Sequence, residues 1–288
     1  MLAIVLALGT SLAYGVANFL APVLMRRHAF AAVLLTGQLA ALVGSVLLLA
    51  FSGESAPDAG AVGLAVLAGV GNAAGLGFFY EAVRFGPLSV ATPVGATAAA
   101  LPVMVGVLGG DTLRALQVVG IVLAIGGAVL AARRESTEED HADWDLPRCV
   151  LFAAFSALGL GVLLTALPGA AADGELFWAL TIQRTTIILC FVALILLRGQ
   201  RFAHPPELPR PTALGRLALL APGLLLLGGT LMYILASERG QLSVVAVCGS
   251  LFPLVTVGLA IVVLRERVAR VQAIGVVAAV LGVVLIAL

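Results

Sequence analysis

Charged residues are scarce in this sequence: they make up 11% of the 288 residues, against 61% hydrophobic residues and a mean hydropathy of +1.15. Soluble globular chains are about 25% charged, and a soluble fold of this size with so few charges could not cover its surface with polar groups. The formal net charge of +1 leaves no basic surface for nucleic acid. The composition therefore excludes an ordinary cytosolic enzyme, a nucleic-acid-binding protein and a disordered tail protein.

Motifs for catalysis and cofactor binding are also missing. There is no Walker A sequence, which argues against direct use of ATP. The three cysteines, Cys149, Cys190 and Cys248, lie in apolar runs without metal-ligand spacing, so we expect them to pack as small core residues. No acidic residue falls at the centre of an apolar run, which argues against the proton relay typical of pumps. We expect no enzymatic activity, no metal and no cofactor.

Long apolar runs dominate what is present. A helix that rises about 1.5 Å per residue needs roughly 20 apolar residues to cross about 30 Å of hydrocarbon. Nine runs contain no Asp, Glu or Arg: 1–25, 28–53, 59–80, 85–110, 115–132, 149–172, 217–237, 240–264 and 271–288. A tenth run, residues 176–197, is equally apolar except for Arg184. The sequence predicts an all-α polytopic membrane protein with ten transmembrane helices.

The two halves of the chain resemble each other. Residues 86–90 (Gly-Pro-Leu-Ser-Val) align with residues 240–244 (Gly-Gln-Leu-Ser-Val), and Gly95 aligns with Gly249. Because each half has five spans, an odd number, the second half must enter the membrane from the opposite side. Such inverted repeats are typical of secondary transporters. The predicted units are a first repeat at 1–132, a charged linker at 133–148 and a second repeat at 149–288.

Several motifs carry a family resemblance. Residues 80–90 (Tyr-Glu-Ala-Val-Arg-Phe-Gly-Pro-Leu-Ser-Val) and 264–268 (Leu-Arg-Glu-Arg-Val) resemble the EamA-type branch of the drug/metabolite transporter superfamily. Tyr14-Gly15 takes the place of the Trp-Gly often found in that family, and Asp111 that of a usual Glu. The resemblance covers nearly the whole chain. It implies a ten-helix carrier that moves a small metabolite such as an amino acid, mostly outward, across a bacterial inner membrane.

Other functions stay open at this stage. A flippase for a lipid-linked intermediate would need lateral openings between helices, with Arg184 facing a phosphate. A membrane-embedded enzyme would need a clustered acid–base or metal group, which the sequence does not show, and a scaffold would not need a polar cavity. For a carrier, the expected partners are a small-molecule metabolite and the lipid bilayer, with no nucleic acid, and a homodimer is left open.

Arginine is distributed unevenly over the loops. Thirteen arginines lie in the odd-numbered connections, whereas the even-numbered connections hold only Arg114 and Arg239. The positive-inside rule then places the odd-numbered connections in the cytoplasm and both termini outside. The family resemblance implies the reverse, with both termini inside.

Arg184 is the most informative single residue, because it lies eight residues after Leu176 in an otherwise apolar run. Insertion scales assign a cost of about 2.5–3.5 kcal/mol to an arginine at a helix centre. Such a cost favours a polar partner, a hydrated cavity or an anionic substrate. The alternatives are that Arg184 reaches the headgroups, or that it bonds to carbonyls and holds two helices together.

Neutral polar residues within the spans are the other candidates for a substrate cavity. Their amides and hydroxyls can bind a zwitterion without the cost of a buried charge. Each can instead form an interhelical hydrogen bond, worth about 0.6 kcal/mol on average. The predicted substrate-binding residues are Tyr14, Asn18, Gln38, Asn72, Tyr80, Gln183, Arg184, Tyr233 and Ser250.

Acidic residues near the ends of the spans have two interpretations. Glu81 can couple transport to a proton, or it can pair with Arg84 three residues later, and Glu238 beside Arg239 is similar. Asp111 and its repeat counterpart in the second half, Glu266, precede the fifth and tenth spans, where we expect them to cap helix N-termini.

Small residues and prolines predict how the spans pack and bend. Gly71 and Gly75 in the third span, and Gly120 and Ala124 in the fifth, have the four-residue spacing that lets helices approach closely. Prolines within the fourth and ninth spans are expected to kink these helices: they are Pro93, Pro102 and Pro253.

Overall fold

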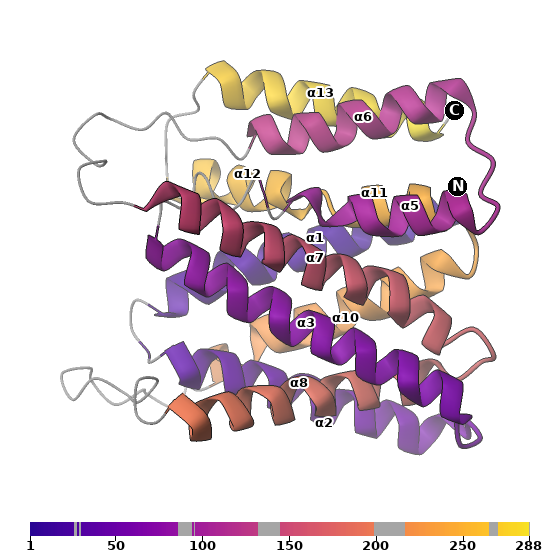
Figure 1. Ribbon diagram of the computed structural model, residues 1–288, viewed down its shortest axis with the longest axis vertical. Coiled ribbons are helices and arrows are strands. Elements are labelled where there is room, and N and C mark those ends of the chain that lie inside the picture. Colours follow the sequence, from indigo (N-terminus) through magenta and orange to yellow (C-terminus); the bar gives the residue numbers. More distant parts are fainter. Residues whose placement is uncertain are drawn as a thin grey trace.

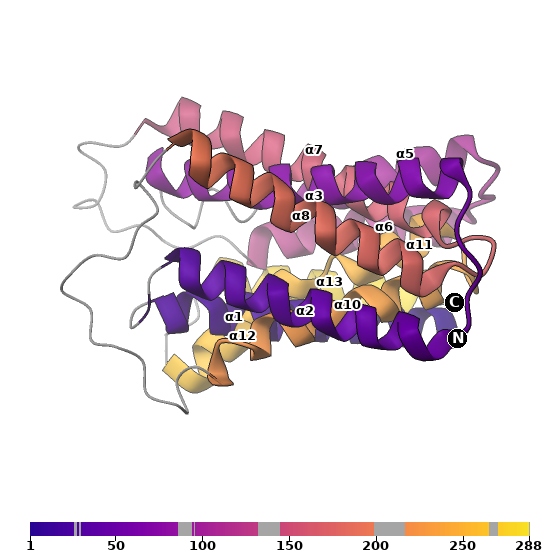
Figure 2. The same ribbon diagram turned by 90° about the horizontal axis from the view of Figure 1, so that it is seen from below.

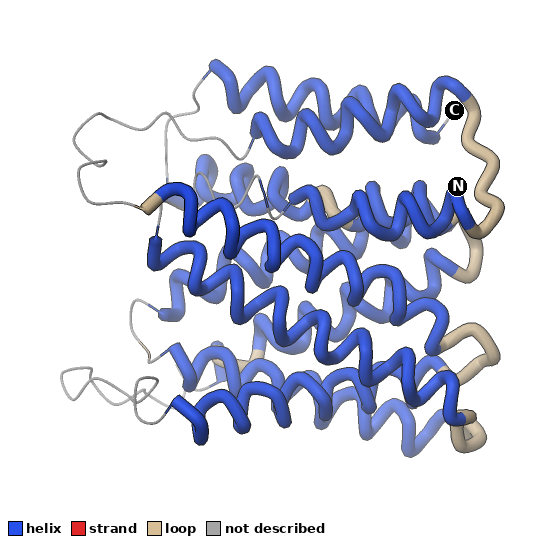
Figure 3. The backbone as a smooth tube through the Cα atoms, in the orientation of Figure 1, coloured by secondary structure: helices blue, strands red, loops and turns tan. Residues whose placement is uncertain are grey.

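The computed structural model describes residues 1–25, 28, 30–85, 94, 96–131, 145–198, 217–264 and 270–287. Within these residues the chain forms helices and connecting loops only (Figure 3). Both termini lie at the same end of the helix bundle, as an even number of crossings requires (Figure 1). We call this the terminal end, where α1 begins, and the other the opposite end, where α3 finishes.

The helices group into ten spans. Five of them are long and apolar enough to cross a membrane, and the described part of the others consists of shorter apolar helices. The first half contains α1 (Leu2–Met25), α2 (Phe30–Ser52), α3 (Ala59–Phe85), the 3-10 turn η1 (Ala96–Ala99) with α5 (Ala100–Leu108), and α6 (Ala115–Ala131). The second half contains α7 (Leu146–Ala170), α8 (Leu176–Arg198), α10 (Ala221–Ser237), α11 (Leu242–Gly249) with α12 (Phe252–Leu264), and α13 (Arg270–Ala287). The predicted fold class, an all-α polytopic membrane protein, is confirmed.

Helix packing in one half is repeated, with the partners exchanged, in the other. α3 packs along α7 as α10 packs along α1, and α3 contacts α8 as α10 contacts α2. η1 and α5 contact α7, as α12 contacts α1. Three further contacts each pair a helix of the first half with its counterpart in the second: α2–α8, α5–α11 and α6–α13. α3 and α7 lie in one layer, and α1, α2 and α12 lie in the other (Figure 2). An inverted repeat about an axis in the membrane plane produces this exchange.

Glycines allow the closest of these helix contacts. A Cβ atom added to Gly71 of α3 would lie 2.8 Å from the carbonyl oxygen of Gly159 in α7, and one added to Gly159 would lie 2.6 Å from the backbone nitrogen of Gly75. Between α6 and α13, a Cβ on Gly282 would lie 2.5 Å from the nitrogen of Ala124. The predicted close packing of the third and fifth spans is confirmed.

The ninth span is interrupted, and the described part of the fourth span passes from a 3-10 turn into an α-helix. α11 finishes at Gly249 and α12 begins at Phe252, so Pro253 lies in the first turn of a new helix, where proline is tolerated. Pro102 likewise lies in the first turn of α5, directly after η1. The expectation of a kink inside a continuous helix was therefore wrong for Pro253. Pro102 lies just beyond the change from 3-10 to α-helix, and Pro93 lies outside the described residues.

Short connections at the terminal end are built from caps and glycines. The Asp58 carboxylate accepts a hydrogen bond of 2.6 Å from the Ala61 amide and so caps α3. Gly53 follows α2 directly with φ +69, the left-handed conformation that favours glycine at the end of a helix. All three cysteines are free, and Cys149 and Cys248 are buried, as the sequence predicts.

Candidate functional site

Arg184 lies inside the bundle with 1% of its surface exposed. Its Nη1 atom donates a hydrogen bond to Gln38 Oε1 at 3.2 Å, and its Nη2 atom donates to Thr230 Oγ1 at 2.7 Å and to the Leu226 carbonyl at 3.1 Å. The side chain therefore joins α8 to α2 and α10. A snorkelling arginine would keep its charged head exposed, so Arg184 does not reach the headgroups.

Thr230 connects Arg184 to a fourth helix. Its hydroxyl donates to the Leu226 carbonyl at 2.6 Å, and the Tyr14 hydroxyl lies 2.8 Å away. Because Thr230 has one hydroxyl hydrogen, it accepts from both Arg184 and Tyr14. We call Tyr14, Gln38, Arg184 and Thr230 the Arg184 cluster. It combines α1 and α2 from the first half with α8 and α10 from the second.

The charge of Arg184 has no counterion among the described residues. Its partners are an amide, a hydroxyl and a carbonyl, and its Nε atom is buried without a hydrogen-bond partner. A guanidinium stays protonated in proteins, so this is a buried positive charge with neutral ligands. Such a charge is costly unless an anion or further acceptors reach it.

Gln183 differs from Gln38, its counterpart when residues 35–38 (Leu-Thr-Gly-Gln) are aligned with residues 180–183 (Leu-Thr-Ile-Gln). Both amides are buried, at 0% and 2% exposure. Gln38 accepts from Arg184, whereas neither amide atom of Gln183 has a hydrogen-bond partner among the described residues. An unpaired buried amide costs about 1–3 kcal/mol, so it favours a site that a ligand or water completes.

Neither Tyr233 nor Ser250 joins the Arg184 cluster: Tyr233 bonds across to another helix, and Ser250 bonds within its own. The buried Tyr233 hydroxyl donates to the Leu164 carbonyl of α7 at 2.7 Å. Its ring lies against Gly249, where an added Cβ would be 3.1 Å from a ring carbon. The Ser250 hydroxyl donates to the Val247 carbonyl at 3.0 Å, at the break between α11 and α12.

Three further candidates remain without an assigned contact. Asn72 of α3 is buried and Asn18 of α1 is half-buried, and the structure gives neither side chain a hydrogen bond to another described residue. The side chain of Tyr80 lies outside the described part of the chain. The structure thus brings together Tyr14, Gln38 and Arg184 from the predicted set.

Sequence reasoning missed several hydroxyls that bind across helices. Besides Thr230, the Thr10 hydroxyl donates to the Gly229 carbonyl at 2.9 Å, and the Ser11 hydroxyl donates to the Cys248 carbonyl at 2.6 Å. These bonds fix α1 against α10 and α11. Each residue is polar within an apolar run, so the criterion that selected Tyr14 would have found them as well.

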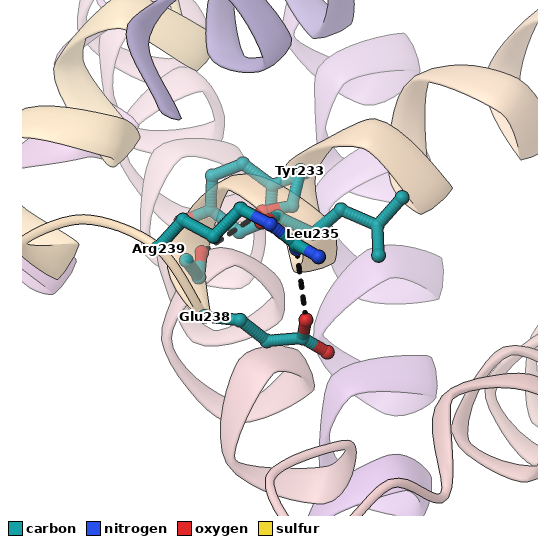
Figure 4. Close-up of polar contacts among 5 residues, drawn as sticks. Tyr233, Leu235, Glu238 and Arg239 are labelled. Atoms are coloured by element: carbon teal, nitrogen blue, oxygen red, sulfur yellow. Dashed lines mark hydrogen bonds and ion pairs between the residues drawn. The ribbon is translucent and has the colours of Figure 1, made fainter. Parts of the chain in front are cut away.

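The acidic residues near the span ends are paired. Glu81 forms an ion pair of 2.8 Å with Arg84, whose side chain is 69% exposed. At the terminal end of α10, Arg239 pairs with Glu238 at 3.0 Å and donates to the Leu235 carbonyl at 2.8 Å (Figure 4). A cation at a helix C-terminus also compensates the helix dipole. These contacts favour the structural interpretation of both acids.

Asp111 is a cap, but of a different helix from the one predicted. Its carboxylate accepts hydrogen bonds from the Ser243 amide at 3.0 Å and the Ser243 hydroxyl at 2.8 Å, in the first turn of α11. It therefore caps the ninth span, not the fifth. Nearby, Gln241 Nε2 donates to the Thr112 carbonyl at 3.0 Å. Glu266, the repeat counterpart of Asp111, lies outside the described residues.

A second carboxylate makes the same kind of contact across the two halves. Glu54, between α2 and α3, accepts from the Phe177 amide at 3.0 Å and from the Trp178 amide at 3.1 Å. These amides lie in the first turn of α8, where the helix dipole favours negative charge. Acidic residues from first-half loops thus cap two second-half helices at the terminal end.

An apolar cavity of about 880 Å³ lies between α3, α7 and α8, toward the opposite end. Four aromatic rings line it: Phe78, Phe85, Phe152 and Phe191. The Glu81–Arg84 ion pair supplies part of its polar lining. The cavity can accept an apolar side chain, and it is distinct from the Arg184 cluster.

Comparison with known families decides the kind of protein. The model described as "EamA-like transporter family" matches residues 1–133 and residues 147–288. The chain belongs to the EamA-like transporter family. No curated protein matches its sequence. One solved structure, described only as "Crystal structure of protein", has a TM-score of 0.75 and 18% identity, and the match covers 98% of this chain and 95% of that chain. This likeness shows a shared fold.

As an EamA-like transporter, the chain is a multi-pass membrane protein of a transport family that is typically non-enzymatic. Its expected partners, a lipid bilayer and a small-molecule substrate, follow from this membership. The resemblance found in the sequence is confirmed, and the enzyme and scaffold alternatives fall away.

Proposed function

We propose that this EamA-like transporter is a secondary carrier that exports a small polar or amphipathic metabolite, such as an amino acid, across a bacterial inner membrane. The observation that supports this most directly is the Arg184 cluster. Its side chains come from both halves of the chain; Gln38, Arg184 and Thr230 are buried, and Tyr14 is half-buried. Secondary transporters bind substrate at such an interface between repeats, near the midplane of the membrane.

The depth of the cluster agrees with a midplane site. Arg184 is eight residues beyond the start of α8 at Leu176. At about 1.5 Å per residue, this places it roughly 12 Å into the span. Half of the hydrocarbon thickness is about 15 Å.

The packing of the fourth and ninth spans supports alternating access. α5 and α11 contact each other at the terminal end, where Asp111 caps α11. Both parts of each span also pack on the first helix of the other half: η1 and α5 contact α7, and α11 and α12 contact α1. We interpret this conformation as closed at the terminal end, and opening would require α5 and α11 to separate.

Counterflow in proteoliposomes tests the proposal. Purified protein would be reconstituted into vesicles loaded with unlabelled amino acids or other small metabolites, and uptake of the labelled compound would be followed. We expect saturable exchange of one class of solute, absent from vesicles without protein. Folded, monodisperse protein that exchanges no solute in the panel would contradict the proposal. Movement of lipid-linked compounds alone would favour a flippase. That alternative requires Arg184 to face a phosphate, whereas Arg184 is buried among neutral protein groups.

A further inference from the structure

The strongest unexplained feature is a set of buried hydrogen-bond donors on α8. Five side-chain atoms of α8 are inaccessible to solvent and lack hydrogen-bond partners among the described residues: both amide atoms of Gln183, together with Trp178 Nε1, Thr181 Oγ1 and Arg184 Nε. Trp178, Thr181 and Arg184 are spaced three residues apart, which corresponds to about 4.5 Å along the helix axis and about 60° around it for each step. They therefore follow one side of α8, from its capped first turn to the Arg184 cluster.

The chemistry of these groups selects an acceptor. Indole and guanidinium N–H groups can only donate, and a hydroxyl can do so as well. The positive charge of Arg184 has no counterion among the described residues. Glu81, Asp145 and Glu238 pair with other arginines, and Glu54 and Asp111 cap helices. A ligand for this side of α8 must therefore bring hydrogen-bond acceptors and negative charge.

We infer that Arg184 and Thr181 form a subsite for the carboxylate group of the transported substrate, which supplies the missing counterion. A carboxylate has two oxygens with about four acceptor positions, enough to accept from Arg184 Nε and the Thr181 hydroxyl together. The indole N–H of Trp178, one turn closer to the terminal end, is available to a substrate that carries a further acceptor. This inference rests on the proposed function and names its substrate class.

Pairs of compounds that differ only in the carboxylate test the inference on the unmodified protein. In the counterflow assay, phenylalanine would compete with a labelled amino acid more strongly than phenethylamine would. Charge-assisted hydrogen bonds distinguish such a pair, so we expect at least a tenfold difference in the concentration that halves uptake. Thermal unfolding gives a second readout, because a bound carboxylate raises the melting temperature of the protein and its decarboxylated analogue does not.

A substitution with a matched control tests the residues. Thr181→Val removes a hydroxyl that has no hydrogen-bond partner in the described part of the chain, so no hydrogen bond between described residues is lost. We expect it to weaken apparent affinity for the amino acid about tenfold and to leave that for phenethylamine unchanged. Thr185→Val removes an exposed hydroxyl that bonds only to the Thr181 carbonyl of its own helix, and it should change neither affinity. Arg184→Gln, in protein shown to be folded, should abolish discrimination between the two compounds.

The possible failures are distinguishable. Absence of exchange for every solute would contradict the proposed function itself. Saturable exchange in which phenethylamine competes as well as phenylalanine, or in which Thr181→Val behaves like Thr185→Val, would overturn the carboxylate subsite and leave the carrier intact. Exchange or stabilisation by phosphate-bearing lipids alone would likewise overturn it.

Discussion

Removing the charge of Asp111 should open the terminal end of the carrier. The Asp111 carboxylate accepts two hydrogen bonds from Ser243, and it is the charged contact between α11 and the loop after α5. In Asp111→Asn one oxygen can still accept, but the charge is lost. Hydrogen bonds to charged groups contribute about 1.5–3 kcal/mol, against about 0.5–1.5 kcal/mol for neutral pairs. The charge near the helix N-terminus adds about 0.3–1 kcal/mol.

These magnitudes set the expected shift in population. Because Asp111 is partly exposed, solvent screening lowers the combined loss to about 1–2 kcal/mol. If the open conformation lacks the Asp111–Ser243 contact, its population relative to the closed form should rise about 5- to 30-fold. Ser243→Ala removes one of the two hydrogen bonds and should give a smaller shift in the same direction.

Pulsed electron paramagnetic resonance can measure this shift. Spin labels would be attached at Thr112 and Glu238, which are exposed at the terminal end, after the three native cysteines are replaced by alanine. We expect Asp111→Asn to increase the fraction of long distances. Asp58→Asn is the matched control, since Asp58 at the same end caps α3 within its own half. Equal distance distributions in Asp111→Asn and the parent protein, or an equal change in Asp58→Asn, would refute this reasoning.

Three further predictions concern packing, coupling and orientation. Gly159→Ala should lower the melting temperature by several degrees, because its Cβ would lie 2.6 Å from backbone atoms of α3, whereas Gly63→Ala, with nothing within 4 Å, should not lower it. Glu81→Gln should leave the response of counterflow to a pH gradient unchanged, because Glu81 is paired with Arg84; loss of that response would restore a coupling role. A reporter active only in the cytoplasm, fused after Leu288, should stay silent if the arginine distribution sets the orientation, and its activity would support the family-based alternative.

The fold could be predicted from the sequence because its determinants are local. Ten apolar runs of membrane-spanning length follow from composition alone, and Gly71 and Gly75 mark a close helix contact without knowledge of the partner. The interruption of the ninth span could not be seen, because the apolar run continues through Ser250 and Leu251. A backbone break changes hydrogen bonding and leaves hydropathy unaltered.

Partners of the site residues depend on tertiary packing, which the pattern does not contain. Arg184 stands out in the sequence as a charge in an apolar run, but its contact with Thr230 exists only because α8 meets α10. The same holds for Asp111, whose partner Ser243 is 132 positions away. The position of Asp111 just before the fifth span suggested that it caps that span, but in the fold it lies at the N-terminus of α11 instead.

The repeat also explains why Gln183 is left without a partner. Aligning Gln38 with Gln183 places Leu39 opposite Arg184, so the first half has an apolar residue where the second has a cation. Gln38 therefore meets Arg184, whereas Gln183 lacks an equivalent donor. In the proposed carrier, such a symmetric scaffold would open at either end with similar helix movements. The charge of Arg184 is present on one side of the repeat axis only, so a substrate carboxylate would bind in one orientation. A substrate that enters from either end of the bundle would meet the same Arg184.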